Sequence, residues 1–222
     1  MQFKFLFFSL LTLILMGQGC TSIRVVKPLP KGDMNIGLNA GGPLIEFGGT
    51  PIFVPLSAFY TAYGVSDKFT LTGGLHTTSL AFKNLQLDAG LLYGVRDSEG
   101  WIPGLSLSAM ANFTYGFSEG ESRLGPQADF HLFWESGEKS LVYAGSSFYM
   151  DLYPNASQPA HRFKSIWPTI NLGYNRGNEK WNFGIEYKIL APGRDNRDGV
   201  IDFIEILPGM TSGLYFNVSR KL

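Results

Sequence analysis

The sequence predicts an all-β fold: a closed, antiparallel, up-and-down transmembrane β-barrel of about ten strands, with eight to twelve allowed. Three observations predict it. Segments of roughly ten residues alternate between apolar and polar side chains, and the connections between them are alternately short and long. Large aromatic residues also gather beside the short connections. No helix of ordinary length is expected after the N-terminal segment.

The composition favours the same class of protein. The 222 residues carry 18 basic and 18 acidic side chains, so the chain shows no electrostatic preference for nucleic acid. Charged residues make up 16% of the chain, below the roughly 25% usual in soluble domains. Aromatic residues make up 14%. No internal apolar run approaches the ~20 residues that a membrane helix needs, whereas barrel strands need only short alternating segments.

The N-terminal segment has the features of a secretory signal. Lys4 precedes an apolar run over residues 5–16, and small residues follow up to Gly19. Cys20, the only cysteine, comes next, and this arrangement resembles the lipobox of bacterial lipoproteins. The resemblance implies a signal peptide over residues 1–19, cleavage before Cys20 and acylation of its thiol. The alternative is an ordinary signal peptide with an incidental cysteine.

Residues 20–32 are expected to form the acylated cysteine and a linker, because the segment contains two prolines and shows no clear period. Residues 33–222 are expected to form the barrel. Its clearest strand is 105–115, where one face is Leu, Ala, Phe and Tyr and the other is mostly Ser, Asn and Thr. Good alternation also marks 85–94, 126–134, 168–175, 181–189 and 213–219. Weaker strands are expected at 34–40, 56–64, 69–75 and 141–152.

The breaks between these segments predict a direction across the membrane. Short breaks fall at 66–67, 97–100, 136–139 and 177–180. Longer ones fall at 41–54, 77–84, 116–123, 154–166 and 192–208. Membrane barrels have short periplasmic turns and long outer loops, and an even strand count puts both chain ends on the short-turn side.

Two features favour a lipid-facing barrel over a soluble one. The polar strand faces are rich in Gly, Ser, Thr, Asn and Gln, whereas a surface in water is normally rich in Lys and Glu. Six aromatic residues beside the short turns are expected to form an interface belt: Phe69, Tyr93, Trp101, Trp134, Tyr174 and Trp181. A tethered periplasmic binding barrel with an apolar core is the alternative.

The polar faces contain few charged residues, and these are candidates for the lumen. The expected polar network consists of Asp88, Asp129, His131, Glu186 and Lys188. An ion-pair network that plugs a narrow barrel is the first interpretation, and a polar path for a solute is the second. His76 is a candidate for a hydrolase site at the outer rim, with Gln86 or Asp88 near it on the next strand and Ser79 in the adjoining loop.

Residues 41–49 (GGPLIEFGG), 84–90 (NLQLDAG) and 213–216 (GLYF) look similar to a group of uncharacterised outer-membrane β-barrel lipoproteins of Gram-negative bacteria. The resemblance implies an outer-membrane location, but no activity. We expect a lipid anchor at Cys20, periplasmic termini, and a structural or accessory role in docking with other envelope proteins. The alternatives are a small pore, an outer-rim lipid or peptide hydrolase, and the tethered barrel. Outer-membrane lipid is the expected partner. No metal, cofactor or nucleic acid is expected, and enzymatic activity is not favoured.

Overall fold

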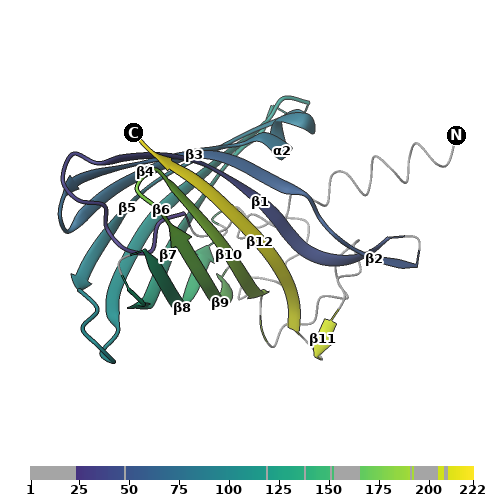
Figure 1. Cartoon of the computed structure of the whole chain (residues 1–222). Helices are drawn as coiled ribbons and strands as arrows, with labels where there is room; N and C mark the ends of the chain where they lie inside the picture. Colours follow the sequence, from purple (N-terminus) through teal and green to yellow (C-terminus); the bar gives the residue numbers. More distant parts are fainter. Residues whose placement is uncertain are drawn as a thin grey trace, which may run out of the picture.

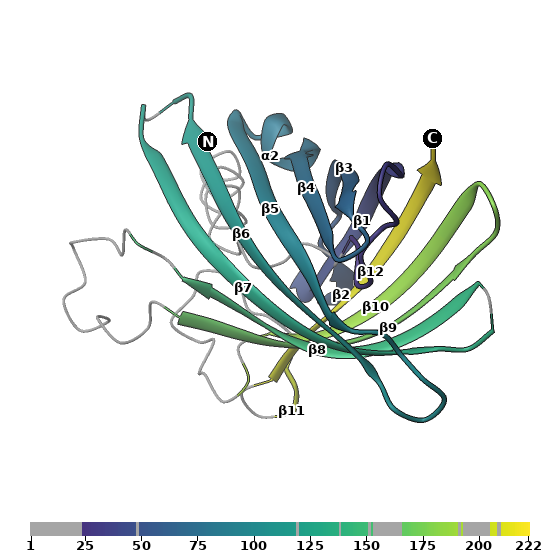
Figure 2. The same ribbon diagram turned by 90° about the vertical axis from the view of Figure 1, so that its left-hand side faces the viewer.

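A computed structural model describes residues 24–47, 49–118, 120–137, 139–150, 152, 166–190, 192, 205–207 and 210–222. The expected signal peptide and Cys20 lie outside these residues, as do most of the loops expected at 154–166 and 192–208. The described chain consists almost entirely of antiparallel strands wound around one axis (Figures 1 and 2). Among the described residues, no helix is long and apolar enough to cross a membrane.

Ten long strands form the wall, as the sequence predicts. They are β1 (Met34–Phe47), β3 (Leu56–Ser66), β4 (Phe69–His76), β5 (Asn84–Arg96), β6 (Gly104–Gly116), β7 (Ser122–Glu135), β8 (Ser140–Met150), β9 (Ile166–Gly177), β10 (Trp181–Leu190) and β12 (Met210–Lys221). Each long strand pairs with the next one along the chain, and β12 returns to β1. Two short strands, β2 (Thr50–Phe53) and β11 (Glu205–Leu207), extend beyond this wall.

The pairing of the first and last strands closes the barrel. The register between β1 and β12 runs from Asn35↔Lys221 to Pro43↔Gly213. Closure gives the long strands a partner on both sides, so the wall has no free edge. In lipid this is required, because unpaired backbone N–H and C=O groups would find no water to bond.

The two ends of the barrel differ. At the short-turn end, β3 turns into β4 through Asp67 and Lys68, and the β9–β10 and β7–β8 connections are also brief. The start of β1 and the end of β12 lie at this end, where the Leu222 amide donates a hydrogen bond of 2.9 Å to the Met34 carbonyl. The opposite, long-loop end carries the five-residue helix α2 (Thr77–Ala81) between β4 and β5 (Figure 2).

The sequence predicts a loop at 41–54, and this prediction is wrong. β1 continues to Phe47 and forms a hairpin with β2, pairing Leu44 with Phe53. The Gly-Gly-Pro sequence suggests a break because glycine and proline weaken strand interiors. Pro43 is tolerated because it forms the last residue pair between β1 and β12. Its missing N–H therefore does not interrupt the hydrogen-bond ladder between these two strands. The hairpin of residues 44–53 therefore projects past the wall at the long-loop end (Figure 1).

Two other long connections contain elements that the strand pattern does not fully predict. The 77–84 break holds α2. The 192–208 break contains the short strand β11 among its described residues.

The side chains are distributed inside out relative to a soluble protein. Every long strand presents a large apolar residue that is exposed on the outer surface, among them Phe59, Leu107, Leu172 and Phe183. The buried positions are instead rich in Ser, Thr, Asn and charged residues. An apolar exterior around a polar interior is the arrangement of a membrane β-barrel, since lipid replaces water on the outside.

This distribution predicts unequal effects of arginine at two adjacent positions. Ala109 of β6 faces outward near the middle of its strand, whereas Ser108 faces inward and donates a hydrogen bond of 2.5 Å to Asp129. Ala109→Arg should lower the free energy of unfolding from lipid vesicles by about 2–4 kcal/mol, because the charge must enter lipid. Ser108→Arg, at the same depth, should cost clearly less because Asp129 can pair with it. Equal losses in urea titrations would contradict the assignment of the two faces.

Candidate functional site

Residues 24–33, which we call the strap, run into the barrel: residues 24–29 are buried or half-buried, whereas Pro30, Lys31 and Gly32 are exposed at the short-turn end. The strap enters at the short-turn end, where the Lys31 amide donates to the Asp67 carboxylate at 3.0 Å. Two residues nearer the N-terminus, the Leu29 amide donates a hydrogen bond to the Thr70 hydroxyl at 2.8 Å. The sequence predicts a linker here and gives no indication of this position.

The next contacts of the strap lie further inside the lumen. The Ser106 hydroxyl donates to the Val26 carbonyl at 2.6 Å. The Val26 side chain, 2% exposed, forms an apolar cluster with Phe133 and Tyr143, which point inward from β7 and β8. The lumen is therefore filled here by a strap residue and two wall aromatics.

Glycines in the wall make room for the strap. A Cβ built on Gly94 would meet the Pro28 ring at 2.7 Å, and one on Gly64 would collide with the Pro30 carbonyl. A Cβ on Gly74 would collide with the guanidinium of Arg24. Absent side chains at these positions allow the strap to lie directly against the wall.

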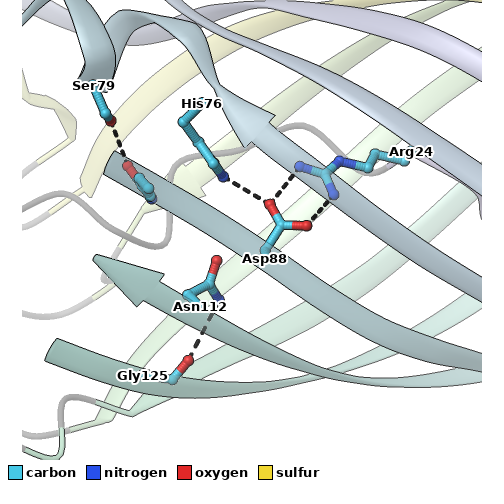
Figure 3. A network of polar contacts seen from close by, with 7 residues as sticks. Arg24, His76, Ser79, Asp88, Asn112 and Gly125 are labelled. Atoms are coloured by element: carbon cyan, nitrogen blue, oxygen red, sulfur yellow. Dashed lines mark hydrogen bonds and ion pairs between the residues drawn. The ribbon is translucent and has the colours of Figure 1, made fainter. Parts of the chain in front are cut away.

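The strap reaches its deepest described point at Arg24, which forms the centre of the candidate site (Figure 3). Both terminal nitrogens of its guanidinium donate to Asp88 of β5, one of them at 2.5 Å. His76, at the end of β4, places Nε2 2.7 Å from the same carboxylate. The guanidinium carbon also lies 5.5 Å from the centre of the Tyr60 ring. We call Arg24, Asp88, His76 and Tyr60 the Arg24 cluster.

Burial makes the Arg24–Asp88 contact a strong constraint. The two side chains are 4% and 0% exposed. A planar guanidinium matches a carboxylate in two parallel hydrogen bonds, which fixes orientation as well as distance. Removing either partner would leave a buried charge with too few partners, and that loss is costly even where the intact pair contributes little net stability.

The hydrolase arrangement considered from the sequence is only partly assembled. His76 and Asp88 do meet, but the Ser79 hydroxyl donates to Gln86 at 2.5 Å (Figure 3). A nucleophilic serine needs the imidazole as its proton acceptor. Asp88 is moreover held by Arg24, so the cluster acts as an anchor for the strap.

A second polar cluster occupies the opposite wall. Lys188 and Glu186 of β10 lie inward with their charged groups 3.4 Å apart. The Tyr143 hydroxyl donates to Glu186 at 2.8 Å, and the Lys188 ammonium lies 5.3 Å from the centre of the Tyr215 ring. Lys188 and Tyr215 are almost fully buried, so large side chains occupy the lumen beside β10 and β12.

Asp129 and His131 also lie on the buried side of β7, where their contacts differ. Asp129 accepts hydrogen bonds from Ser108 at 2.5 Å and from Gln127 at 2.7 Å. His131 packs edge-on against Tyr143, with ring centres 6.2 Å apart, and neither ring nitrogen has a hydrogen-bond partner among the described residues. The five residues expected in one lumen network are thus all buried, with Asp88 in the Arg24 cluster and Glu186 beside Lys188 on the opposite wall.

The six aromatic residues of the expected belt lie at the short-turn end. Phe69 and Tyr93 stack across β4 and β5 with ring centres 4.7 Å apart. Trp101 lies in the β5–β6 turn itself and is 95% exposed, and its carbonyl accepts from Trp134 at 3.2 Å. Arg220 lies over the Trp181 ring. Tyr174 is exposed on β9, and a role of these residues at a bilayer interface remains a prediction.

Three lumen residues are not among those that the sequence singles out: Arg24, Tyr60 and Tyr143. The two tyrosines share strand faces with small and polar residues, so alternation could have placed them inward. Nothing in the local sequence indicates that Arg24 meets Asp88, 64 positions away. No group of three or more His, Cys, Asp or Glu side chains able to hold a metal occurs in the described part of the chain.

Comparisons with solved structures found membrane barrels that resemble this chain at low identity. The NanC porin matches at 11% identity over 84% of this chain and 100% of that chain, with a TM-score of 0.46. The translocator domain of the autotransporter NalP from Neisseria meningitidis matches at 12% over 94% and 93%, with a TM-score of 0.42. The outer membrane protein OprG from Pseudomonas aeruginosa matches at 11% over 89% and 99%, with a TM-score of 0.31.

No family model matches the chain, and no curated protein matches it. At such low identity and structural overlap the barrel resemblances carry no argument about function. The functional interpretation therefore rests on the chain's own residues.

A double-mutant cycle should separate the buried ion pair from an exposed one on the same strap. Arg24→Ala should lower the free energy of unfolding by about 3–5 kcal/mol, because Asp88 loses its main partner in a buried site. The double variant with Asp88→Ala should cost less than the two single changes added together. Lys27 and Glu135, 2.8 Å apart but 39% and 36% exposed, provide the control.

For that control pair the coupling should be only about 0.2–1 kcal/mol. Urea unfolding in lipid vesicles measures all the variants. Coupling at Arg24–Asp88 as small as at Lys27–Glu135 would contradict the anchoring role of the Arg24 cluster.

Proposed function

We propose that the chain is a bacterial outer-membrane lipoprotein whose barrel is closed by its own strap and serves a structural or accessory role in the envelope. One observation carries the proposal: the strap and the inward side chains fill the lumen. The apolar exterior supports insertion in a membrane, and the short turns and the end of β12 are assigned to the periplasmic side. Acylation of Cys20 provides an additional attachment to lipid.

A closed lumen favours an accessory role over a diffusion pore. Val26, Phe133, Tyr143, Lys188 and Tyr215 are each at most 2% exposed, so these inner side chains contact protein atoms and not an aqueous channel. An open pore would leave such residues in contact with water along its length. The polar inner wall nevertheless makes a pore the second candidate, in a state from which the strap has withdrawn.

The projecting hairpin supports a docking role. Beyond Pro43, β1 pairs with β2 alone, and β2 has no partner on its other side in the described sheet. Ile52 and Phe53 are 38% and 49% exposed on it. A strand edge with apolar side chains outside the barrel wall offers backbone and side-chain contacts to another envelope protein.

The closed lumen predicts the electrical behaviour of the purified protein. Full-length barrel with Cys20→Ser, reconstituted in a planar bilayer, should show no steady ion conductance. Arg24→Ala should produce channel openings, because the strap loses its deepest attachment. Adding Pro28→Cys and Gly94→Cys should suppress those openings on oxidation, since the close approach of these positions suits a disulfide.

Reduction of that disulfide should restore the openings, and oxidant should have no effect on Arg24→Ala without the cysteine pair. Steady conductance in the full-length protein, unchanged by the disulfide, would reject the closed barrel in favour of a pore.

Lipidation predicts the behaviour of a separate variant. In cells supplied with a fatty-acid probe, the wild-type protein should be labelled and Cys20→Ser should not, because the thiol is the acceptor. The unlabelled variant should still require detergent for extraction, since the apolar exterior does not depend on the anchor. Persistent labelling would reject the lipoprotein assignment, and a variant that is folded and soluble in water would indicate a tethered soluble barrel.

A further inference from the structure

We infer that the outer surface of β9, β10 and β12 carries a binding site for an anionic phospholipid at the short-turn end. Arg176, Lys180 and Arg220 bind the phosphate of the lipid, and Trp181 lies at the level of its headgroup. We call these four residues the Trp181 patch. The inference rests on the proposed insertion of the barrel in a membrane, and it assigns a chemical preference to the lipid on one side of the wall.

The strand register places both arginines of the patch on the outer surface. The strand β10 lies between β9 and β12 (Figure 1). Arg176 of β9 pairs with Phe183 of β10, which is 57% exposed on the outside. Arg220 of β12 pairs with Trp181 of β10, and its guanidinium carbon lies 5.8 Å from the centre of that ring. Directly paired residues project from the same face of a sheet, so the two guanidinium groups flank the aromatic rings of β10.

The two arginines are close enough to contact one lipid. Neighbouring strands lie about 4.8 Å apart, so about 10 Å separates β9 from β12 across β10. Arg176 and Phe183 share their row with Val218, and Arg220 is two residues further along β12. The Cα atoms of the arginines are therefore about 12 Å apart. Long, flexible side chains cover such a span while their stems lie along apolar surface.

The basic side chains of the patch have no acidic partner in the protein. None of the three forms an ion pair within the described residues, whereas the adjacent Lys221 bonds to Asp33 at 2.5 Å. Glu179, in the same turn as Lys180, is the acidic residue nearest in sequence. Three basic side chains and this acidic one leave an excess of two positive charges. A lipid phosphate supplies both the charge and the hydrogen-bond acceptors that these groups lack.

Two basic residues on the β5–β7 side of the same end are bonded differently. The Arg96 guanidinium donates two hydrogen bonds to the Pro103 carbonyl, at 3.2 and 2.8 Å. Lys27 of the strap lies 2.8 Å from Glu135 at the end of β7. Both cations therefore have acceptors within the protein. The short-turn end is thus uneven around the barrel, and its unpaired arginines gather beside Trp181.

The surface beside the patch suits the rest of a phospholipid. From the patch towards the middle of the wall, exposed apolar side chains continue on all three strands, namely Phe183, Ile185, Tyr174 and Phe216 at 57%, 42%, 38% and 50% exposure. Acyl chains can lie along this surface while the phosphate stays with the cations. A zwitterionic headgroup brings its own cation next to its phosphate. An excess of positive charge on the protein therefore favours an anionic lipid.

Quenching of Trp181 by brominated lipids tests this site. The full chain with Cys20→Ser keeps Trp181 as its single tryptophan after Trp101, Trp134 and Trp167 are changed to Phe. It is folded into vesicles of equimolar phosphatidylcholine and phosphatidylglycerol, with one lipid brominated at a time and unbrominated vesicles as the reference. Phosphatidylglycerol should be enriched about five-fold around Trp181, since one interfacial cation already favours an anionic lipid by about that factor.

A charge-matched pair of double variants separates the site from the total charge. Arg176→Gln with Arg220→Gln should lower the enrichment to about one-fold, because no unpaired guanidinium remains beside Trp181. Lys31→Gln with Lys68→Gln removes the same charge from two exposed side chains at the same end and should leave the enrichment unchanged. Equal losses in the two double variants would overturn the inference.

Two further measurements decide the matter if the glutamine variant does not fold. Arg176→Lys with Arg220→Lys should keep most of the enrichment, because an ammonium group also binds phosphate. In the single-tryptophan protein itself, high salt should lower the enrichment towards one-fold, because exposed charges are screened. No enrichment at low salt, or an enrichment that salt does not change, would contradict the proposed site.

A second reporter distinguishes this inference from membrane insertion itself. Trp134 is made the single tryptophan by changing Trp101, Trp167 and Trp181 to Phe. Both brominated lipids should quench Trp134, with a smaller preference that Arg176→Gln and Arg220→Gln do not change. Quenching of Trp181 without lipid preference would overturn the inference and leave the insertion intact. Absence of quenching at both tryptophans would instead reject the insertion on which both proposals rest.

Discussion

The pairing of β12 with β1 is the constraint on which the rest of the structure depends. A strand in lipid cannot leave its backbone groups unpaired, so ten long strands must close into one ring. Closure of an antiparallel up-and-down ring requires an even count, and the even count brings Met34 and Leu222 together at the same end. The same closure separates two surfaces, an outer one that must be apolar and an inner one that need not be.

The inner surface is where this barrel departs from a simple pore. A ring of this size encloses a narrow space that side chains can fill, and here the chain's own strap occupies part of it. Wall glycines such as Gly64, Gly74 and Gly94 leave room for the strap backbone and for Arg24. The strap therefore packs directly against the wall and occupies space that a diffusing solute would need. For this reason the accessory role is favoured over diffusion through the lumen.

The polar groups of the interior restrict the arrangement as much as the packing does. Asp88 is satisfied only when Arg24 and His76 approach it from different segments, and Glu186 draws Lys188 and Tyr143 together across the opposite side. A buried charge that must find its partner specifies the depth of the strap.

The sequence by itself determined the strand pattern. Alternation along β5, β6 and β10 is local, and it depends only on side chains pointing to opposite faces of a strand. It also indicated that Asp88, Asp129, His131, Glu186 and Lys188 lie on the faces opposite the apolar side chains. The tertiary structure alone decided that Gly41–Gly42–Pro43 continues a strand, because pairing with β12 and then β2 supports it. It also decided that Arg24 anchors the strap to Asp88, because the closed barrel brings together two residues that are 64 positions apart. The residues next to each of them in the sequence do not indicate this contact.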